Sequence, residues 1–263
     1  MLRLKKAGMV FHSGTVNEKT VIQDLDLQVN QGDFITIIGS NGAGKSTLFN
    51  LIAGTHQPTS GQIFFKDRDI TREPEYRRAA YMGRIFQNPL LGTASNMTLE
   101  DNMMITLRKG FKGLKISLNS RRRREFQGYL KDLSMGLEDR LKDNVGLLSG
   151  GQRQALTLLM MALSRPDLIL LDEHTAALDP RNARLVLDLT NRYIDEYGLT
   201  AMMITHNMAD AIAMGNRLLM LDEGRILLDV RGEDKKRLTV EALVDIFHRV
   251  KKQDYANDKS LLS

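Results

Sequence analysis

The sequence contains no cysteine, which excludes disulfide bonds and zinc sites built from thiolates. It also has no uninterrupted run of about 18 apolar residues, the length that a membrane-spanning helix needs. The basic N-terminus, MLRLKKAGMVF, lacks an apolar stretch long enough for a signal peptide. These absences predict a cytoplasmic chain that does not cross a bilayer by itself.

What the chain does contain is ordinary for a folded protein. Of its 263 residues, 42% are hydrophobic and 26% are charged, a balance that argues against disorder. The net charge of +5 is too mild to indicate a partner. The sharpest local feature is the run Arg121–Arg124, for which a solvated helix entry and a contact with an acidic partner or membrane surface are both open.

Strand-like segments lie toward both ends of the chain, and helical spacing dominates between them. The segments expected as strands are residues 2–11, 21–29, 34–38, 61–70, 168–172, 200–205 and 217–229. The first, second and fourth have the character of a half-buried antiparallel sheet, whereas Phe34–Ile38 is apolar throughout and predicts a strand buried on both faces. The last segment contains a hairpin turn at its DEG sequence.

Helices are expected in three further places. One follows the loop 39–44 and ends at Gly54, and another begins at Pro180, with Asp179 as its N-cap, and ends at Gly198. Residues 239–252 predict a final amphipathic helix, followed by a frayed tail.

Residues 39–46, GSNGAGKS, match the phosphate-loop pattern G-x-x-x-x-G-K-[ST] between an expected strand and an expected helix. In such a loop, glycines let backbone N–H groups surround a phosphate, the lysine contacts phosphate oxygens and the serine hydroxyl binds Mg²⁺. A plain glycine-rich turn would need a chance match as well as the right flanking elements. The candidate nucleotide-binding residues are Gly39, Ser40, Asn41, Gly42, Ala43, Gly44, Lys45, Ser46 and Thr47.

An acidic pair, Asp172 and Glu173, follows the apolar segment LILL. Asp172 is placed to hold Mg²⁺, usually through water, and Glu173 to polarise the water that attacks the terminal phosphate. Acidic pairs also end strands as solvated caps, but the phosphate loop in the same chain favours the catalytic interpretation.

A second glycine-containing segment, LSGGQ at residues 148–152, opens an expected helix. As an N-cap, Ser149 needs no ligand, but each glycine in a first helical turn costs about 1 kcal/mol relative to alanine. Because bare N–H groups at a helix start bind anions, we expect Ser149, Gly150, Gly151 and Gln152 to contact a phosphate that another loop already holds.

Together, the phosphate loop and LSGGQ resemble the nucleotide-binding subunits of ATP-binding cassette (ABC) transporters, and the resemblance extends to about residue 228. It implies a role for four more residues. Gln87 would contact Mg²⁺ and water and link to the membrane partner, Asp179 would communicate across a dimer, His206 would hold the γ-phosphate, and Phe11 would stack on adenine.

The resemblance also implies the fold: an α/β P-loop NTPase core with an antiparallel β subdomain and an inserted α-helical subdomain. We assign residues 1–87 and 166–232 to the ATP-binding core with its β subdomain, 88–165 to the helical signature subdomain, and 233–263 to a C-terminal helix and tail. Two residues depart from the family pattern, because His174 stands where proline is common and Phe11 replaces a frequent tyrosine. We expect both departures to be neutral.

In this family two cassettes pack head to tail, with each ATP between the phosphate loop of one copy and the LSGGQ of the other. The resemblance therefore implies ATP and Mg²⁺ as cofactors and a second copy of the chain as a partner. Separate membrane permease subunits would dock around residues 87–95 and on the helical subdomain, at the inner face of the cell membrane. The wording of the motifs is similar to bacterial importers of small solutes such as amino acids, which work with a substrate-binding lipoprotein.

Three other functions were weighed against an importer. An exporter ATPase remains an alternative, since direction is inferred only from the resemblance. Non-transport ABC ATPases that act on nucleic acid or ribosomes carry tandem cassettes, coiled coils or zinc modules, none of which this sequence has, so no nucleic-acid partner is expected. A small-molecule kinase leaves LSGGQ and His206 unexplained.

Overall fold

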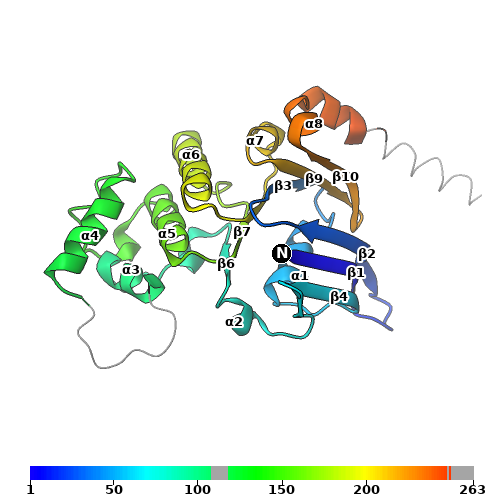
Figure 1. Ribbon diagram of the computed structural model, residues 1–263, viewed down its shortest axis with the longest axis horizontal. Coiled ribbons are helices and arrows are strands. Elements are labelled where there is room, and N and C mark those ends of the chain that lie inside the picture. Colours follow the sequence, from blue (N-terminus) through cyan, green and yellow to red (C-terminus); the bar gives the residue numbers. More distant parts are fainter. Residues whose placement is uncertain (108–117, 248, 250–263) are drawn as a thin grey trace, which may run out of the picture.

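The computed structural model describes residues 1–107, 118–247 and 249. A helical region, a central sheet and a second sheet follow one another along the long axis of the molecule (Figure 1). The central sheet has six strands in the order β10-β9-β3-β8-β7-β6, and the second has four in the order β2-β1-β4-β5.

The central sheet is parallel except for β10, which forms a hairpin with β9. Its strands are β3 (Phe34–Gly39), β6 (Met82–Ile85), β7 (Leu168–Asp172), β8 (Ala201–Ile204), β9 (Arg217–Asp222) and β10 (Arg225–Arg231). Every residue of β8 and β9 is buried, as expected for strands covered on both faces. The predicted buried strand at Phe34–Ile38 and the predicted hairpin are both confirmed.

The second sheet is antiparallel and consists of β1 (Leu2–Phe11), β2 (Lys19–Val29), β4 (Ser60–Phe65) and β5 (Arg68–Asp69). Alternate residues of β2, among them Leu25, Leu27 and Val29, point into an apolar core that also contains helix α1 (Lys45–Ala53). This core joins the two sheets around the helix that follows the phosphate loop.

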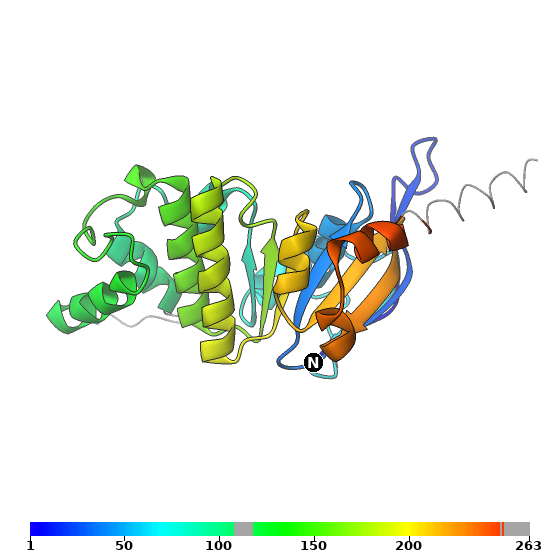
Figure 2. The same ribbon diagram turned by 90° about the horizontal axis from the view of Figure 1, so that it is seen from above.

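The helical region lies at the opposite end of the molecule from the antiparallel sheet (Figure 1). Its elements are η1 (Pro89–Gly92), α3 (Leu99–Leu107), α4 (Ser120–Lys131), η2 (Val145–Leu147) and α5 (Gly150–Ser164). Helix α6 (Pro180–Tyr197) runs beside α5 (Figure 2), and both contribute to one apolar core. The α/β class with a P-loop core, an antiparallel β subdomain and an inserted helical subdomain is confirmed, while the boundaries at 88 and 165 stay predictions.

Some short elements were not predicted, and a further helix follows them. Helices α2 (Glu75–Arg78) and α8 (Gly232–Lys236), together with strand β6, were not predicted from the sequence, and α7 (Met208–Ala213) follows β8. Residues 240–247 are helical, in line with the helix expected over 239–252. Residues 248 and 250–252 of that expected helix, and the expected tail, lie outside the described residues. Among the described residues, no helix combines the length and apolar character required to cross a membrane.

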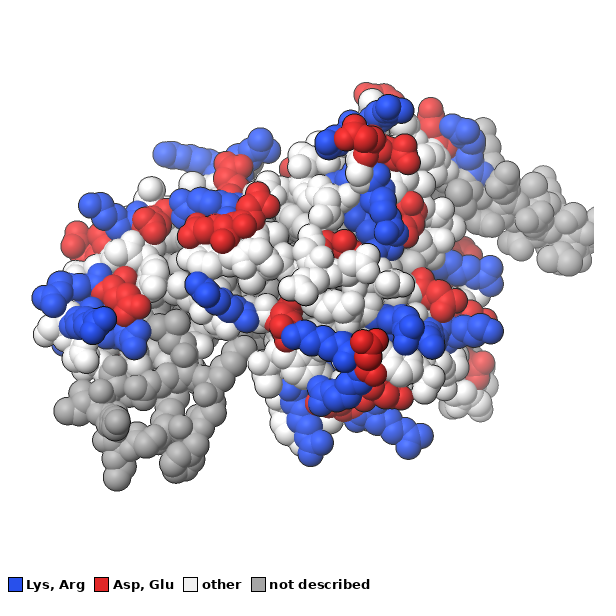
Figure 3. All heavy atoms as spheres, viewed as in Figure 1, with Lys and Arg blue, Asp and Glu red and all other residues white. Residues whose placement is uncertain are grey.

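Charged side chains of both signs are mixed over the face shown in Figure 3. The run Arg121–Arg124 lies in the first turns of α4, where Arg122 pairs with Glu125 and Arg123 with Glu100. These internal pairs fit the solvated helix entry better than a dedicated contact surface.

Arg78 is the largest side chain that is completely buried in the described part of the chain. Its guanidinium donates hydrogen bonds to five backbone carbonyls, those of Leu51, Ile52, Ile70, Thr71 and Glu73. Two of these carbonyls belong to the last turn of α1, where they have no acceptor role within the helix. Arg78 therefore holds the C-terminal end of the helix that begins at the phosphate loop.

We expect Arg78→Met to lower the free energy of unfolding by about 3 kcal/mol or more, because several buried carbonyls lose their donor. Urea denaturation followed by circular dichroism would measure the change. Arg77→Met, which alters an exposed neighbour, is the control. A loss for Arg78→Met no greater than that of the control would contradict this role.

Candidate functional site

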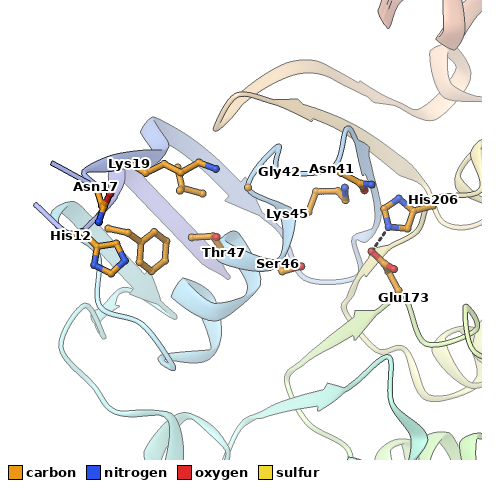
Figure 4. Close-up of a pocket in the computed structure, with 13 residues that line it drawn as sticks. His12, Asn17, Lys19, Asn41, Gly42, Lys45, Ser46, Thr47, Glu173 and His206 are labelled. Carbon is orange, nitrogen blue, oxygen red and sulfur yellow. Dashed lines mark ion pairs between the residues drawn. The ribbon is translucent and has the colours of Figure 1, made fainter. Parts of the chain in front are cut away.

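Several predicted site residues surround one cavity at the carboxyl edge of the central sheet (Figure 4). The cavity has a volume of about 490 Å³, within the range of ligand pockets. From the predicted set, it is lined by Phe11, Asn41, Gly42, Gly44, Lys45, Ser46, Thr47, Glu173 and His206. The structure thus brings together residues from β1, from the loop after β3, and from the segments that follow β7 and β8.

The phosphate loop reaches the start of α1 through Gly44, whose φ of 97° lies in the left-handed region. A Cβ at this position would lie 2.8 Å from Ile22 Cδ1 and 2.9 Å from the Val21 carbonyl oxygen. Only glycine fits so close to β2. Because the residues of the first helical turn line the cavity, the unpaired N–H groups of that turn make it suited to an anion.

Lys45 is the buried cation of the cavity, with 6% of the residue exposed. Its Nζ donates to the carbonyl oxygens of Gly39 and Ser40, each at 2.9 Å. Burial lowers the pKa of Lys45, while the carboxylates of Glu173 and Asp172 act in the opposite direction. Such a poorly solvated ammonium is ready to bind phosphate oxygens.

Glu173 and His206 point toward each other at one end of the cavity (Figure 4), with Oε1 2.5 Å from Nε2. The glutamate is largely buried, whereas the histidine side chain is 48% exposed. Glu173 also has a left-handed backbone, with φ of 47°, and its N–H donates to the Ile204 carbonyl. A left-handed backbone costs free energy in a residue other than glycine, and the hydrogen bond to Ile204 helps to hold Glu173 in it.

Asp172 does not line the cavity, and its carboxylate forms an ion pair with Arg84 at 2.8 Å. Within the described residues, no group of three or more His, Cys, Asp or Glu side chains could hold a metal by itself. Mg²⁺ commonly takes one or two protein carboxylates together with phosphate oxygens and water. The Asp172 carboxylate and the Ser46 hydroxyl therefore fit a metal that arrives with a nucleotide.

The predicted second phosphate-binding segment lies at the N-terminus of α5, and none of Ser149, Gly150, Gly151 and Gln152 lines the cavity. Ser149 and Gln152 form a capping box in which each side chain bonds the other's backbone.

The two glycines of this segment differ in their surroundings. A Cβ on Gly151 would lie 2.7 Å from Asn182 Cγ, so packing against α6 excludes a side chain there. Capping by Ser149 gives no reason for a glycine at position 151, but this contact with Asn182 does. A Cβ on Gly150 would meet only Leu178 Cδ2, at an ordinary 3.6 Å. The fold does not require glycine at position 150, which leaves its surface open to a ligand.

Two more predicted residues lie away from the cavity. Asp179 caps α6 by accepting a hydrogen bond from the Asn182 backbone, and its pKa is lowered mainly by hydrogen bonds from Asn182. Because Asn182 also contacts Gly151, the N-terminal ends of α5 and α6 lie together. Gln87 follows β6 and is exposed to solvent.

Four residues that line the cavity were not predicted from the sequence: His12, Asn17, Lys19 and Val21. They belong to the hairpin between β1 and β2, in which Phe11 pairs directly with Lys19. In Figure 4 the Lys19 side chain extends toward the phosphate loop. Antiparallel pairing of these strands, which the sequence predicted, is what brings Lys19 beside Phe11 and could have pointed to it.

A second, more apolar cavity of about 340 Å³ lies between the central sheet and the helical region. We call it the β6 groove; its lining includes Ala53, Ala79, Met82, Arg84, Phe86, Met161 and Pro166. Exposed apolar side chains occur on neighbouring elements, among them Tyr76 on α2, Leu90 and Leu91 on η1, and Ile105 on α3. Exposed apolar surface of this kind often marks a protein contact.

His174, the residue after Glu173, is buried against α6, and its Nε2 lies 3.0 Å from Thr190 Oγ1. The Thr190 hydroxyl donates its hydrogen to the Val186 carbonyl, so it must accept from His174. Nε2 therefore carries a hydrogen, and burial lowers the pKa of His174 to about 4, which keeps the ring neutral near pH 7. That a histidine in place of the common proline leaves function unaffected stays a prediction.

Comparison with known proteins gives relatives of one kind. A family model described as ABC transporter matches residues 22–176. The chain is 40% identical to the tyrosine transport ATP-binding protein of Clostridioides difficile, over 94% of this chain and 98% of that protein. It is 32% identical to the aliphatic sulfonates import ATP-binding protein SsuB 1 of Rhizobium johnstonii, over 80% of this chain and 71% of that protein.

A solved structure gives the same fold. The chain is similar to the ATP-binding cassette MJ0796, a dimer in a post-hydrolysis state bound to ADP and Pi, with a TM-score of 0.73. The likeness covers 88% of this chain and 98% of that one at 24% identity, and at this level it concerns the fold alone.

His174 predicts a loss of stability in mild acid. Its folded pKa of about 4 lies below the ordinary value of 6.5, so the unfolded chain takes up the proton first. The stabilising contribution is complete above about pH 6.5 and is lost as the pH falls toward 4, with about 2 kcal/mol lost between pH 7 and pH 5.

His174→Gln keeps a donor for Thr190 without the titration. Urea denaturation at pH 7 and pH 5 should show a smaller difference for this variant than for the wild type. His12→Gln, at an exposed histidine, should leave the difference unchanged. Equal pH dependence in His174→Gln and the wild type would refute the assignment.

Proposed function

The chain belongs to the ABC transporter family, and from this premise we propose how its two phosphate-binding segments work together. It is an ATPase subunit of the importer type, which energises transport through separate membrane permeases. We propose that two copies close head to tail on two ATP molecules, so that each copy's LSGGQ segment completes the other copy's site.

The observation that carries this proposal is the separation of the two segments within one chain. The phosphate loop lines the 490 Å³ cavity, whereas Ser149 to Gln152 do not. Gly150 is free of packing constraints and stands at a helix N-terminus, where N–H groups attract anions. A partner's nucleotide is the anion that such a surface would meet in a head-to-tail pair. The similar cassette MJ0796 is dimeric, which supports a pair of chains.

Within each site, we assign a function to every predicted residue. The loop from Gly39 to Thr47 holds the phosphates, with Lys45 as their countercharge, while Phe11 stacks on the base. Ser46, Asp172 and Gln87 would hold Mg²⁺, which neutralises phosphate charge when bound. Glu173 accepts a proton from the attacking water, and His206, now paired with Glu173, holds the γ-phosphate. Asp179 connects the two copies at their interface.

The β6 groove and the exposed apolar residues near it are the surface that we assign to the permease. The groove lies between the nucleotide-binding core and the helical region, so a segment seated in it would contact both parts. Docking there would hold the chain at the inner face of the cell membrane.

We further propose a substrate-binding lipoprotein as a partner of the complex, and an amino acid as the solute. Tyrosine is the first solute to test, because the 40% identical relative is a tyrosine transport protein.

We expect Glu173→Gln to reduce ATP turnover by at least about 100-fold, since the amide cannot accept the proton. With turnover blocked, ATP and Mg²⁺ should hold two copies together, so gel filtration should show a species of twice the 29.7 kDa chain mass. Glu173→Gln combined with Lys45→Ala is the control and should elute as a monomer. If the Glu173→Gln chain were monomeric at saturating ATP, the head-to-tail proposal would be contradicted.

Gly150→Asp separates folding from function at the second segment. An acidic residue in a first helical turn stabilises the helix, so the free energy of unfolding should stay equal or rise by up to about 1 kcal/mol. The same charge would repel the partner's phosphates, and ATP turnover should fall by at least about 100-fold. ATP binding to the monomer should be unchanged.

Gly128→Asp, at another glycine with open space around it, is the matched control and should keep full turnover. Retained turnover in Gly150→Asp would show that this position does not face a phosphate.

A further inference from the structure

The Asp172 carboxylate, which we propose as a metal ligand, is bound by an arginine. Arg84 lies on β6, the strand next to β7, and its Nη2 donates to Asp172 Oδ2 at 2.8 Å. Both side chains are only 14% exposed. A carboxylate so far removed from water needs a countercharge, and Arg84 supplies it.

Two further contacts fix the guanidinium in place. Its Nη1 donates to Asn50 Oδ1 at 2.8 Å, and Asn50 belongs to α1, the helix that begins with Lys45. On one face, Arg84 Cζ lies 4.8 Å from the centroid of the Phe86 ring. The arginine is therefore held by the carboxylate, by the nucleotide-binding helix and by an aromatic ring.

A divalent cation that approaches Asp172 meets this fixed positive charge. The guanidinium already uses one carboxylate oxygen and neutralises the charge that would attract the metal. A metal ion on its own gains little by replacing it. A metal accompanied by phosphate groups brings further negative charge, which outweighs the repulsion from Arg84.

We infer that Arg84 is a positioning residue that holds Asp172 between turnovers and makes metal binding at Asp172 depend on bound nucleotide. The inference rests on the proposed role of Asp172 as a metal ligand. Arg84 then competes with the metal for Asp172, whereas an arginine in a purely structural ion pair would not.

The competition can be measured with Mn²⁺ alone, by following the free-ion signal in electron paramagnetic resonance during titration of the nucleotide-free protein. Arg84→Gln keeps hydrogen-bond donors for Asp172 and Asn50 but removes the charge. We expect it to bind one Mn²⁺ at least about tenfold more tightly than the wild type does. Arg84→Lys keeps the charge and should behave like the wild type.

Two further variants make the result specific. Arg123→Gln removes an arginine from another ion pair, that with Glu100, and should leave Mn²⁺ affinity unchanged. Arg84→Gln combined with Asp172→Asn should lose the gain. Equal Mn²⁺ affinity in Arg84→Gln and the wild type, or a gain that survives Asp172→Asn, would overturn the inference.

The same titration in the presence of ADP separates this inference from the proposed function. If Asp172 holds the metal, Asp172→Asn weakens Mn²⁺ binding to the ADP complex whatever Arg84 does. Unchanged binding in that variant overturns the metal role of Asp172 itself. A normal loss in Asp172→Asn without a gain in Arg84→Gln overturns only the competition.

Discussion

Hydrogen bonding between parallel strands sets the level at which β3, β7 and β8 end, and the chemistry of the molecule depends on this alignment. Ile37 of β3 and Asp172 of β7 both pair with Ile204, the last residue of β8. The chain therefore leaves all three strands side by side. The phosphate loop, Glu173 and His206 come from distant parts of the sequence, yet they meet because these strands are held in register.

Charges of opposite sign alternate around that edge, and each depends on its neighbours. Lys45 is buried among its own loop carbonyls near two carboxylates, Glu173 is paired with His206, and Asp172 with Arg84. Lys45, Glu173, Asp172 and Arg84 have little access to water, and such charges are stable only in pairs or with hydrogen bonds. In the site that we propose, a nucleotide with several negative charges would enter a set of groups that can exchange partners, as a cycle of binding and hydrolysis requires.

Local signals in the sequence were sufficient for most of the elements. The apolar run at Phe34–Ile38 and the cap, proline and glycine around α6 each determine their structure through neighbouring residues, and all are confirmed. Strand β6 was missed because its four residues include Gly83 and Arg84, which have little strand character. The bonds from Arg78 to the Leu51 and Ile52 carbonyls, the contact of Gly151 with Asn182 and the burial of His174 against α6 join residues that are well separated in the sequence. Pattern analysis does not reach such contacts.

Arg84 belongs to two sites at once, because it also lines the β6 groove together with Phe86. A side chain that enters the groove lies against the residue that neutralises Asp172. Thermodynamic linkage is reciprocal. If a group bound in the groove changes the affinity of Asp172 for a charged ligand, that ligand changes the affinity of the groove by the same factor. Through one shared arginine, the surface that we assign to the permease and the proposed metal site would influence each other over the length of a single side chain.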